Sequence, residues 1–329
     1  FESETINILS MSVQTDAPAR QSNFKLFLQD LLIGGGALAV SRTVVAPLER
    51  IKIVLQTQKP FLIQEPEKFK GFMDALIRIP KNQGVLSLWR GNSTHCFKII
   101  PNTITRFVCY DYIKRAIYSN STGGNIGLLY QIEAALIAGF FSTTISYPWD
   151  MIHTRLAADP SKKNQPRYYK DGWKGMRRIR IAEGFKTIYN GYLVALLATV
   201  PYVTISFTTY DLLKSALTSS EGDKANSVPG ILNWVGLGSI AGVVAHIACY
   251  PLDTVKRRIQ VQGDVRTEIL YTGAYDCFKK MAAKEGFKAF YLGLTPSLLK
   301  IIPAAGVQFA TYDYLRSRFV VNGELKLIQ

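Results

Sequence analysis

The segment Pro47-Leu-Glu49-Arg-Ile-Lys52 occurs three times along this chain in related forms. It returns as Pro148-Trp-Asp150-Met-Ile-His153 and as Pro251-Leu-Asp253-Thr-Val-Lys256, so that the three prolines lie 101 and 103 residues apart. In every copy an acid follows the proline by two positions, and a base, or a histidine in the second copy, follows it by five. An internal period of this length indicates one structural unit repeated three times.

The composition favours a membrane protein. The 329 residues are 48% hydrophobic and 19% charged, and the formal net charge is +15. No charge-free run reaches the ~18 residues of a simple spanning helix, so the apolar helices should face water on one side, where their charges lie. The positive charge suits an anionic membrane surface or an anionic substrate. Because the basic residues are dispersed and form no recognition module, we expect no nucleic-acid partner.

The reactive side chains do not form a catalytic or metal-binding set. The four cysteines, Cys96, Cys109, Cys249 and Cys277, show neither CxxC spacing nor histidine partners at metal-site spacing, which predicts reduced thiols and no metal. A nucleophile–base pair and a glycine-rich phosphate loop are also missing. We therefore expect neither an enzyme nor a bound cofactor.

The repeats are expected at residues 24–118, 126–218 and 228–319, with a flexible N-terminal extension at 1–23 and a C-terminal tail at 320–329. Each repeat contains an apolar helix through the proline motif and a second apolar helix through Pro101, Pro201 or Pro303. Between them lies a short amphipathic segment, at 71–81, 171–182 and 274–284. Proline inside a helix removes a hydrogen bond and kinks it. The fold class is thus an all-α membrane protein, with six kinked transmembrane helices in three pseudosymmetric repeats and three short amphipathic helices on one side.

Small residues are frequent in the first apolar helix of each repeat. In the third repeat Gly238 and Gly242 stand at GxxxG spacing. This spacing is typical of helix backbones that approach each other closely in a bilayer, and we expect such contacts here.

The acid and the base of each proline motif share one face of their helix, because residues three apart are neighbours on a helix surface. They can form local surface pairs, but their threefold recurrence beside a proline favours pairing between helices. A symmetric bundle then closes at one end through Glu49–His153, Asp150–Lys256 and Asp253–Lys52. An imidazole is largely neutral at alkaline pH, so the pair with His153 is expected to be the weakest. The histidine then means either that the gate is held less tightly or that a sequence change without functional effect has been tolerated at this position.

A second charged motif recurs in the other helices of the three repeats. It reads Tyr110-Asp111-Tyr-Ile-Lys114, Tyr210-Asp211-Leu-Leu-Lys214 and Tyr312-Asp313-Tyr-Leu-Arg316. These residues lie beyond the central prolines of their helices and should therefore be at the opposite end of the bundle. The expected pairs are Asp111–Lys214, Asp211–Arg316 and Asp313–Lys114.

Candidate substrate-binding residues lie midway along the helices. Lys98, Ala198 and Lys300 each stand three positions before a central proline, and Arg42 and Arg106 add positive charge nearby. A lysine inside a membrane helix is costly unless it faces water or an anion, and several cations around one pocket suit phosphate groups. Further candidates come from one helix, where Ala198, Thr199 and Tyr202 either form a flat slot for a nucleobase or pack in the core.

The two triplicate motifs resemble those of the mitochondrial carrier family across residues 24–319. The resemblance implies a multi-pass protein of the mitochondrial inner membrane with a matrix gate formed by the proline motifs and a cytoplasmic gate formed by the second motifs. The two gates would open alternately, and the amphipathic helices would lie on the matrix side. It also implies bound cardiolipin at the helix starts and aromatic-x-Gly segments, namely Gly71, Trp89, Arg90, Gly91, Gly172, Gly191, Gly273 and Gly293.

Finer similarity is to carriers of the adenine-nucleotide type. The segments Ser41-Arg42-Thr-Val-Val-Ala-Pro47 and Thr154-Arg155-Leu-Ala-Ala-Asp159 resemble ADP/ATP carriers, whereas Arg106 and Lys300-Ile-Ile-Pro303 are more similar to ATP-Mg/phosphate and coenzyme A carriers. The resemblance implies antiport of an adenine nucleotide or a related phosphorylated adenine compound. His153, Ala198 and Thr199 depart from the pattern of strict ADP/ATP exchange. They keep open an alternative, in which the carrier fold serves as a structural or interaction subunit of a larger inner-membrane, respiratory assembly.

Overall fold

The computed structural model describes residues 22–58, 68–120, 128–163, 165–221, 228–263, 269–321 and 324–325. Within this part the long helices are α2 (Ser22–Thr57), α4 (Asn92–Asn120), α5 (Leu128–Ala158), α7 (Tyr192–Glu221), α8 (Val228–Val261) and a sixth divided into α10 (Leu294–Leu299) and α11 (Ile301–Phe319). The expected all-α fold is confirmed. The expected N-terminal extension lies outside the described residues apart from Ser22 and Asn23, which begin α2. The expected C-terminal tail contains two antiparallel two-residue strands, β1 (Val320–Val321) and β2 (Glu324–Leu325).

Each long helix contains its expected proline. Pro47, Pro148 and Pro251 lie inside α2, α5 and α8, and Pro101 and Pro201 lie inside α4 and α7. The sixth helix is interrupted at Lys300, three residues before Pro303, because a proline has no N–H to donate to the carbonyl four residues back. Backbone hydrogen bonds from Lys300 to Pro296 (3.2 Å) and from Ala304 to Lys300 (3.0 Å) carry the chain across the interruption.

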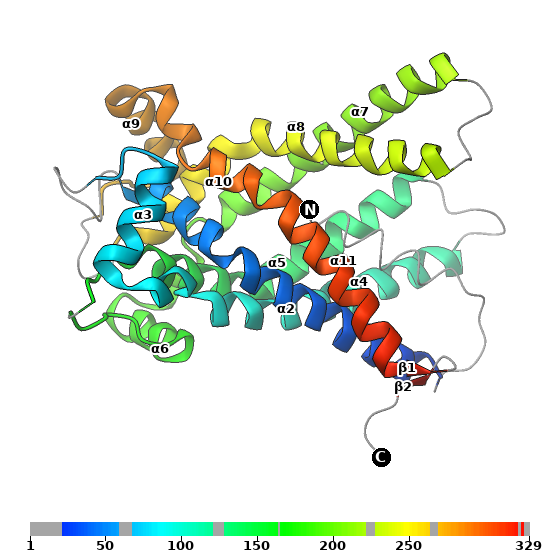
Figure 1. Ribbon diagram of the computed structural model, residues 1–329, viewed down its shortest axis with the longest axis horizontal. Coiled ribbons are helices and arrows are strands. Elements are labelled where there is room, and N and C mark those ends of the chain that lie inside the picture. The colour runs from blue at the N-terminus through cyan, green and yellow to red at the C-terminus, as the bar shows by residue number, and fades with distance from the viewer. Residues whose placement is uncertain are drawn as a thin grey trace.

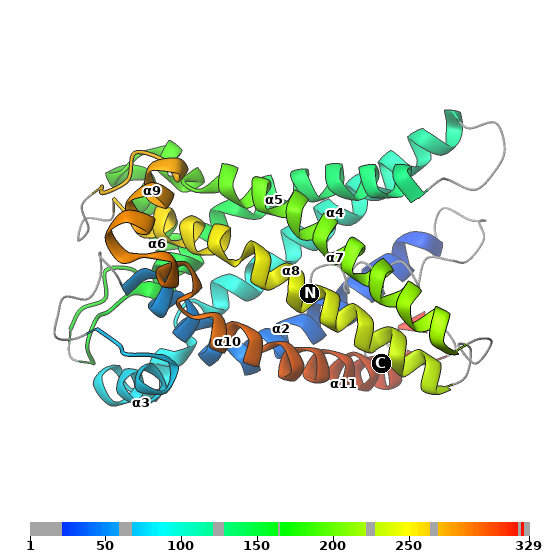
Figure 2. The same cartoon turned by 90° about the horizontal axis from the view of Figure 1, so that it is seen from above.

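The long helices pack as three pairs, α2 with α11, α4 with α5, and α7 with α8. Figures 1 and 2 show, in two perpendicular views, that the three pairs converge at one end of the bundle and spread apart at the other. We call these ends the narrow end and the wide end. The surface helices α3 (Phe72–Gln83), α6 (Gly172–Ala182) and α9 (Ala274–Glu285) all lie at the narrow end.

Each surface helix is followed by a short 3-10 helix that the sequence did not predict. These are η2 (Val85–Trp89), η3 (Phe185–Tyr189) and η5 (Phe287–Tyr291). A glycine with positive φ, Gly84, Gly184 or Gly286, separates the two helices in each repeat. Glycine adopts this backbone conformation without the steric cost that a Cβ would add, so the same turn is made three times.

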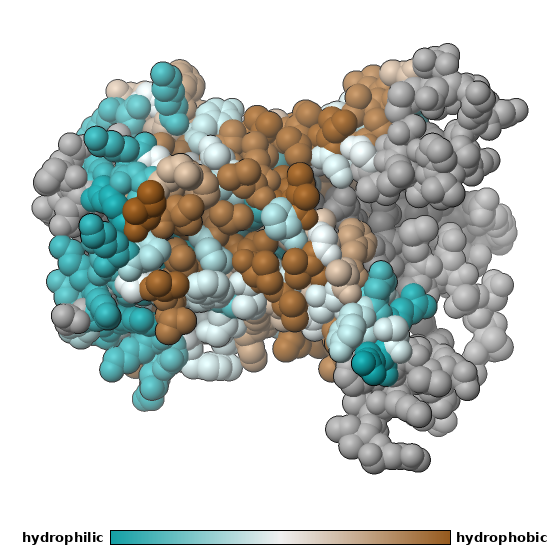
Figure 3. Space-filling model, in the orientation of Figure 1, coloured by the Kyte–Doolittle hydropathy of each residue, from teal (hydrophilic) through white to brown (hydrophobic). Residues whose placement is uncertain are grey.

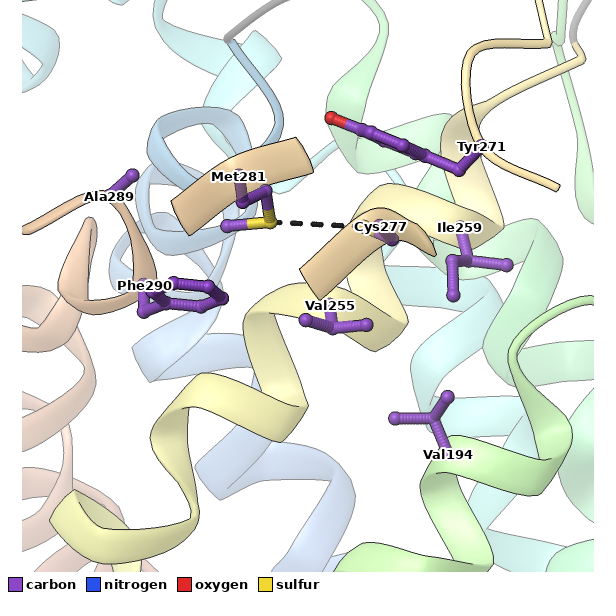
Figure 4. Close-up of a cluster of buried hydrophobic side chains, with 8 residues drawn as sticks. All are labelled: Val194, Val255, Ile259, Tyr271, Cys277, Met281, Ala289 and Phe290. Carbon is purple, nitrogen blue, oxygen red and sulfur yellow. Dashed lines mark hydrogen bonds between the residues drawn. The ribbon is translucent and has the colours of Figure 1, made fainter. Parts of the chain in front are cut away.

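The surface helices pack their apolar faces onto the long helices. Ile79 of α3 is buried, with Phe72 and Leu76 partly buried beside it, as the period of the sequence predicts. Figure 4 shows the corresponding cluster of α9, where Cys277 and Met281 pack among residues of α8 and η5. Burial raises the pKa of the Cys277 thiol to about 12. All four cysteines are free thiols, as expected.

The outer surface of the bundle carries an apolar band. Large apolar side chains such as Val44, Ile145 and Leu197 are exposed on the long helices, and the space-filling view shows brown residues around the middle of the molecule and hydrophilic residues at the narrow end (Figure 3). Among the described residues, three segments are long and apolar enough to cross a membrane by length and composition alone: Leu31–Thr57, Phe185–Ala216 and Phe287–Arg318. A band of this kind suits lipid contact.

The GxxxG segment does not form the close helix contact that its spacing predicts. Within the described part of the chain, no atom lies within 4 Å of a Cβ built on Gly238 or Gly242. Among the described glycines of α2, a Cβ built on Gly36 would lie 3.3 Å from Leu315 Cδ1 of α11, whereas one built on Gly34 or Gly35 would meet nothing within 4 Å. Other small residues of these helices are fully buried, among them Ala37, Ala138 and Ala245.

Candidate functional site

Acidic residues of the three proline motifs lie together at the narrow end. Lys52 Nζ of α2 is 2.8 Å from Asp253 Oδ2 of α8, and the lysine side chain is only 4% exposed. The Gln56 amide donates to the same carboxylate oxygen at 3.1 Å and to Thr254 Oγ1 at 3.2 Å. The Asp253–Lys52 pair predicted from the sequence is formed, and an unpredicted glutamine supports it.

Asp150 of α5 has cationic partners on two neighbouring helices. Its Oδ2 is 2.8 Å from Lys256 Nζ of α8, and its Oδ1 is 2.9 Å from Lys98 Nζ of α4. Gln260 Nε2 also donates to Oδ2 at 3.1 Å. The predicted Asp150–Lys256 pair is thus formed, and Lys98, expected at the substrate site, contacts the same acid.

The expected Glu49–His153 pair is not formed. His153 Nδ1 lies 3.1 Å from the carbonyl oxygen of Gly91, and its ring packs on that of His95 with centroids 4.5 Å apart. Glu49 contacts Nζ of Lys300 instead. The physical reason is that these two contacts fix the His153 ring, while the lysine at the junction of α10 and α11 binds the carboxylate.

Arg257 lies between the acids of two repeats. Its Nη1 is 3.5 Å from Asp150 Oδ2, and its Nε is 3.9 Å from Asp253 Oδ1. We define the narrow-end charge cluster as the acids and cations in these contacts: Glu49, Asp150, Asp253, Lys52, Lys98, Lys256, Arg257 and Lys300. A small apolar group from the ends of α2, α5 and α8 is buried near the tips of these helices and consists of Ile53, Ala157, Ala158 and Val261. Ion pairs and apolar contacts together join the three helices.

The other expected substrate-binding residues lie along the bundle with their side chains half-buried, namely Arg42, Arg106, Ala198 and Tyr202. Thr199 is exposed, and its hydroxyl donates to the Ala195 carbonyl of the same helix at 3.0 Å. Ala198 of α7 stands at the repeat position that is lysine in the other two repeats. The threefold arrangement of cations is therefore incomplete on the side of α7.

The charged residues at the wide end differ from those at the narrow end. Asp211, Lys214, Asp313 and Arg316 are exposed, and Asp111 is half-buried. In the described part of the chain no ion pair joins Asp211 to Arg316, although the sequence predicts one. The side chain of Lys114 lies outside the described residues, so the expected Asp313–Lys114 pair does too. Ion pairs thus join the helices at the narrow end, whereas Asp211, Lys214, Asp313 and Arg316 are exposed at the wide end.

A family model described as mitochondrial carrier protein matches residues 24–121, 125–221 and 229–323. The chain belongs to the mitochondrial carrier family. Each matched segment contains one proline motif, one surface helix and two long helices, which agrees with the threefold arrangement of this carrier.

Similar proteins are named as nucleotide transporters. The carrier is 32% identical to the mitochondrial adenine nucleotide transporter ADNT1 of Arabidopsis thaliana, over 95% of the carrier and 93% of that relative. It is 34% identical to ADP/ATP translocase 2 of Rattus norvegicus, over 88% and 97% respectively. It is also 34% identical to a mitochondrial adenyl nucleotide antiporter of Oryctolagus cuniculus, over 89% of the carrier but only 58% of that longer relative.

The glycines of the aromatic-x-Gly segments touch the backbone of the proline motifs. Gly91, Gly191 and Gly293 all have positive φ. A Cβ built on Gly293 would lie 2.9 Å from the carbonyl oxygen of Lys52. In the same way, a Cβ built on Gly91 would lie 3.1 Å from the carbonyl oxygen of His153, and one built on Gly191 would lie 3.2 Å from that of Lys256. In each repeat of the carrier, a glycine therefore packs on the base position of the next motif.

Other residues expected to bind lipid also make contacts within the protein. Trp89 Nε1 donates to the Thr43 carbonyl at 2.8 Å. Arg90 is buried and donates to the carbonyls of Asp159 (3.1 Å) and Ser161 (3.0 Å), so its guanidinium is directed into the carrier. The remaining glycines of this set, Gly71, Gly172 and Gly273, stand at the N-terminal ends of α3, α6 and α9.

Two arginine–glutamate pairs at the narrow end were missed by sequence reasoning. Arg155 donates to both carboxylate oxygens of Glu183, at 2.5 and 2.8 Å, and to the Gln260 carbonyl of the next repeat at 2.9 Å. Arg258 binds Glu285 in the same way and donates to the Gln56 carbonyl at 3.0 Å. Each pair therefore ties the surface helix of one repeat to a long helix of the next. The Glu-Gly sequence recurs at the C-terminal ends of α6 and α9, and this recurrence could have indicated the two pairs from the sequence.

Proposed function

We propose that this carrier exchanges an adenine nucleotide across the mitochondrial inner membrane by alternating access. The observation that carries the proposal is the contrast between the ends: ion pairs between helices bury the charges of the narrow end, while Asp211, Asp313 and Arg316 are exposed at the wide end. In this interpretation the narrow-end charge cluster is the closed matrix gate. The wide end faces the intermembrane space, and its charges form the cytoplasmic gate when the carrier inverts.

The substrate class is inferred from charge and from the relatives. Lys98, Lys300, Arg42 and Arg106 supply cations for phosphate groups, and Ala198, Thr199 and Tyr202 are the proposed base contacts. The names of all three relatives refer to adenine or adenyl nucleotides or to ADP/ATP. Transport of a phosphorylated adenine compound therefore accounts for both the cations and the similarity. Bound cardiolipin at the surface-helix starts remains part of the proposal.

A structural subunit without transport is the weaker alternative. The relatives are named as transporters, and both lysines of the expected substrate site are present in the charge cluster. None of these relatives is named as a structural subunit.

Exchange in reconstituted liposomes tests the proposal. Purified carrier in cardiolipin-containing vesicles loaded with ADP should take up labelled ATP, ADP or AMP, and vesicles without internal nucleotide should not. The same nucleotides should raise the melting temperature, because a ligand at a hundred times its Kd adds about 2.7 kcal/mol to the free energy of unfolding. Lys98→Ala should abolish uptake. Exchange of coenzyme A, phosphate or a dicarboxylate but not of any adenine nucleotide would contradict the proposed substrate.

A further inference from the structure

The contact between the first and second repeats at the narrow end differs from the other two such contacts. Each of the others has a motif lysine bound to an acid and a glutamine that donates to the same acid, namely Lys52 with Gln56 and Lys256 with Gln260. At the equivalent places the second motif carries His153 and Ala157. The imidazoles of His95 and His153 meet across this contact instead.

His153 is held as a neutral ring with one nitrogen left over. Its side chain is buried, and its Nδ1 lies 3.1 Å from the Gly91 carbonyl oxygen. Because a carbonyl oxygen only accepts hydrogen bonds, Nδ1 carries the proton of the neutral ring. Nε2 is buried and has no hydrogen-bond partner in the described part of the chain. A proton added to Nε2 would therefore create a buried cation with no acceptor.

His95 joins the first repeat to the same place. Its backbone N–H donates to the Gly91 carbonyl at 3.0 Å, and its ring packs on that of His153 with centroids 4.5 Å apart. It stands three residues before Lys98 on α4, hence on the same side of that helix. Protonation of both rings would place two like charges face to face across the contact between repeats, which is unfavourable.

The surroundings of the two rings already carry excess positive charge. Charged groups on four helices interact electrostatically with one or both rings, namely Arg42 and Glu49 of α2, Lys98 of α4, Asp150 of α5 and Arg257 of α8. The narrow-end charge cluster contains five cations and three acids. The Glu49 carboxylate is bound by Lys300, so it is not free to compensate an imidazolium. An unpaired buried charge is strongly destabilising, and the closed narrow end therefore selects neutral histidines.

We propose that His95 and His153 form a proton-binding site between the first two repeats, which stays neutral while the narrow end is closed and is protonated when that end opens to water. By linkage, protons then favour the open narrow end. Above about pH 6.5 an imidazole in water is neutral as well, and the closed end keeps its full stability. As the pH falls below this value, the open end gains protons that the closed end cannot bind, and the balance shifts toward opening.

The inference goes beyond the proposed function, because it does not depend on the identity of the solute. It shares with that function only the opening of the narrow end. In the proposed orientation, acidification of the matrix would favour the carrier that is open to the matrix.

Distances between the surface helices of the two repeats test the proposal. Spin labels are attached at Lys81→Cys of α3 and Arg177→Cys of α6, both exposed positions on helices at the narrow end (Figure 1). The background carries Cys96→Ala and Cys109→Ala, since the other two cysteines are buried. Pulsed electron paramagnetic resonance is recorded without nucleotide on carrier in lipid vesicles frozen at pH 7.5 and at pH 5.5. The ratio of separated to close labels should rise about tenfold at the lower pH, because an ordinary imidazole is then about tenfold more protonated than neutral.

Glutamine variants identify the responsible groups. In His95→Gln with His153→Gln the ratio should not change with pH, and each single variant should show a smaller response than the wild type. His246→Gln is the matched control, because His246 of α8 has a hydroxyl partner, Ser297 Oγ at 2.8 Å, and should not be needed for the response. A wild-type ratio that is equal at both pH values would overturn the proposal. So would a full response in the single variants or in the double variant.

The same labels separate this proposal from the proposed function. If ADP moves the labels apart at pH 7.5 but acid does not, nucleotide exchange stands and the proton site is wrong. If acid moves them apart while no adenine nucleotide does so or is exchanged, the proposed substrate is wrong and the proton site stands. Labels that never separate would contradict both.

Discussion

Gln83 stands where the second and third repeats carry Glu183 and Glu285. Its Oε1 accepts hydrogen bonds from Arg50 Nη2 at 2.6 Å and from Arg90 Nη1 at 3.1 Å. Arg50 is buried and also donates to the carbonyls of Ala157 and Ser87. A neutral amide thus faces two guanidinium groups, whereas Glu183 and Glu285 each bind one arginine, Arg155 or Arg258, which stands seven residues after the proline of its motif. At the residue scale, the first repeat lacks the glutamate that the other two carry at this position, and Asp159 is an acid close to both of its arginines.

We predict that Gln83→Glu stabilises the carrier. A carboxylate at this place forms charge-assisted hydrogen bonds with both arginines, which should add about 1 kcal/mol to the free energy of unfolding after loss of the 3.3 Å bond to the Pro160 carbonyl. Thermal unfolding in detergent measures the change. Asn82→Glu adds the same charge at the exposed neighbouring position and should have little effect. A melting temperature that falls in Gln83→Glu, or rises equally in both variants, would contradict the prediction.

At the scale of elements, the start of the second long helix of each repeat (α4, α7 or α10) is fixed against a proline-motif helix by a glycine and, in two repeats, by a tyrosine as well. Tyr250 of α8 donates to the Leu292 carbonyl at 3.1 Å, and Tyr147 of α5 donates to the Asn190 carbonyl at 2.7 Å. The next residue in each case is the glycine that packs on the backbone of a motif lysine. Helix pairs are therefore positioned at the narrow end through backbone contact, which leaves no room for a larger residue.

We predict that Gly293→Ala destabilises the carrier by about 3 kcal/mol, because it adds strain at positive φ to a clash with the Lys52 carbonyl. The substitution should also loosen the Lys52–Asp253 pair. Gly242→Ala is the matched control. It lies inside α8 with open space around its Cβ among the described residues, and Ala in a helix interior is favoured over Gly by about 0.5–1 kcal/mol. Thermal unfolding of both variants measures the difference, and equal melting temperatures would refute the packing argument.

At the scale of the whole molecule, the charged residues of the two ends differ in burial and in pairing. The narrow end is closed by ion pairs between neighbouring helices, whereas Asp211, Lys214, Asp313 and Arg316 are exposed at the wide end. The helices that carry these motifs are long and continuous between the ends, apart from the interruption at Lys300 (Figure 1). A rigid helix that tilts to open one end brings the other end together, so the charges of both ends are coupled.

We predict that Asp211→Lys slows nucleotide exchange but leaves the stability of the present state within about 0.5 kcal/mol, because Asp211 is exposed here. The double exchange Asp211→Arg with Arg316→Asp should restore transport, since the pair is needed only when the wide end closes. Asp253→Lys serves as the control at the narrow end and should lower the melting temperature strongly. Failure of the double exchange to restore transport would argue against this pairing.

The sequence by itself determined the repeat number, the helical class, the proline positions and two of the three ion pairs at the narrow end. These features follow from local properties: a period near 100 residues, helix-breaking prolines, and acid–base pairs that share a helix face. The surface helices were likewise predictable from their apolar period. The 3-10 helices were not, although the glycines before them recur in every repeat.

Only the tertiary structure decided which cation reaches Glu49. The sequence offered His153 by symmetry, but the Gly91 carbonyl and the interruption between α10 and α11 place Lys300 there instead. The contacts of Gly91, Gly191 and Gly293 with the motif backbones could not be predicted from the sequence either. Such contacts join residues far apart in the chain, and their distances depend on how the helices pack, which no local pattern encodes.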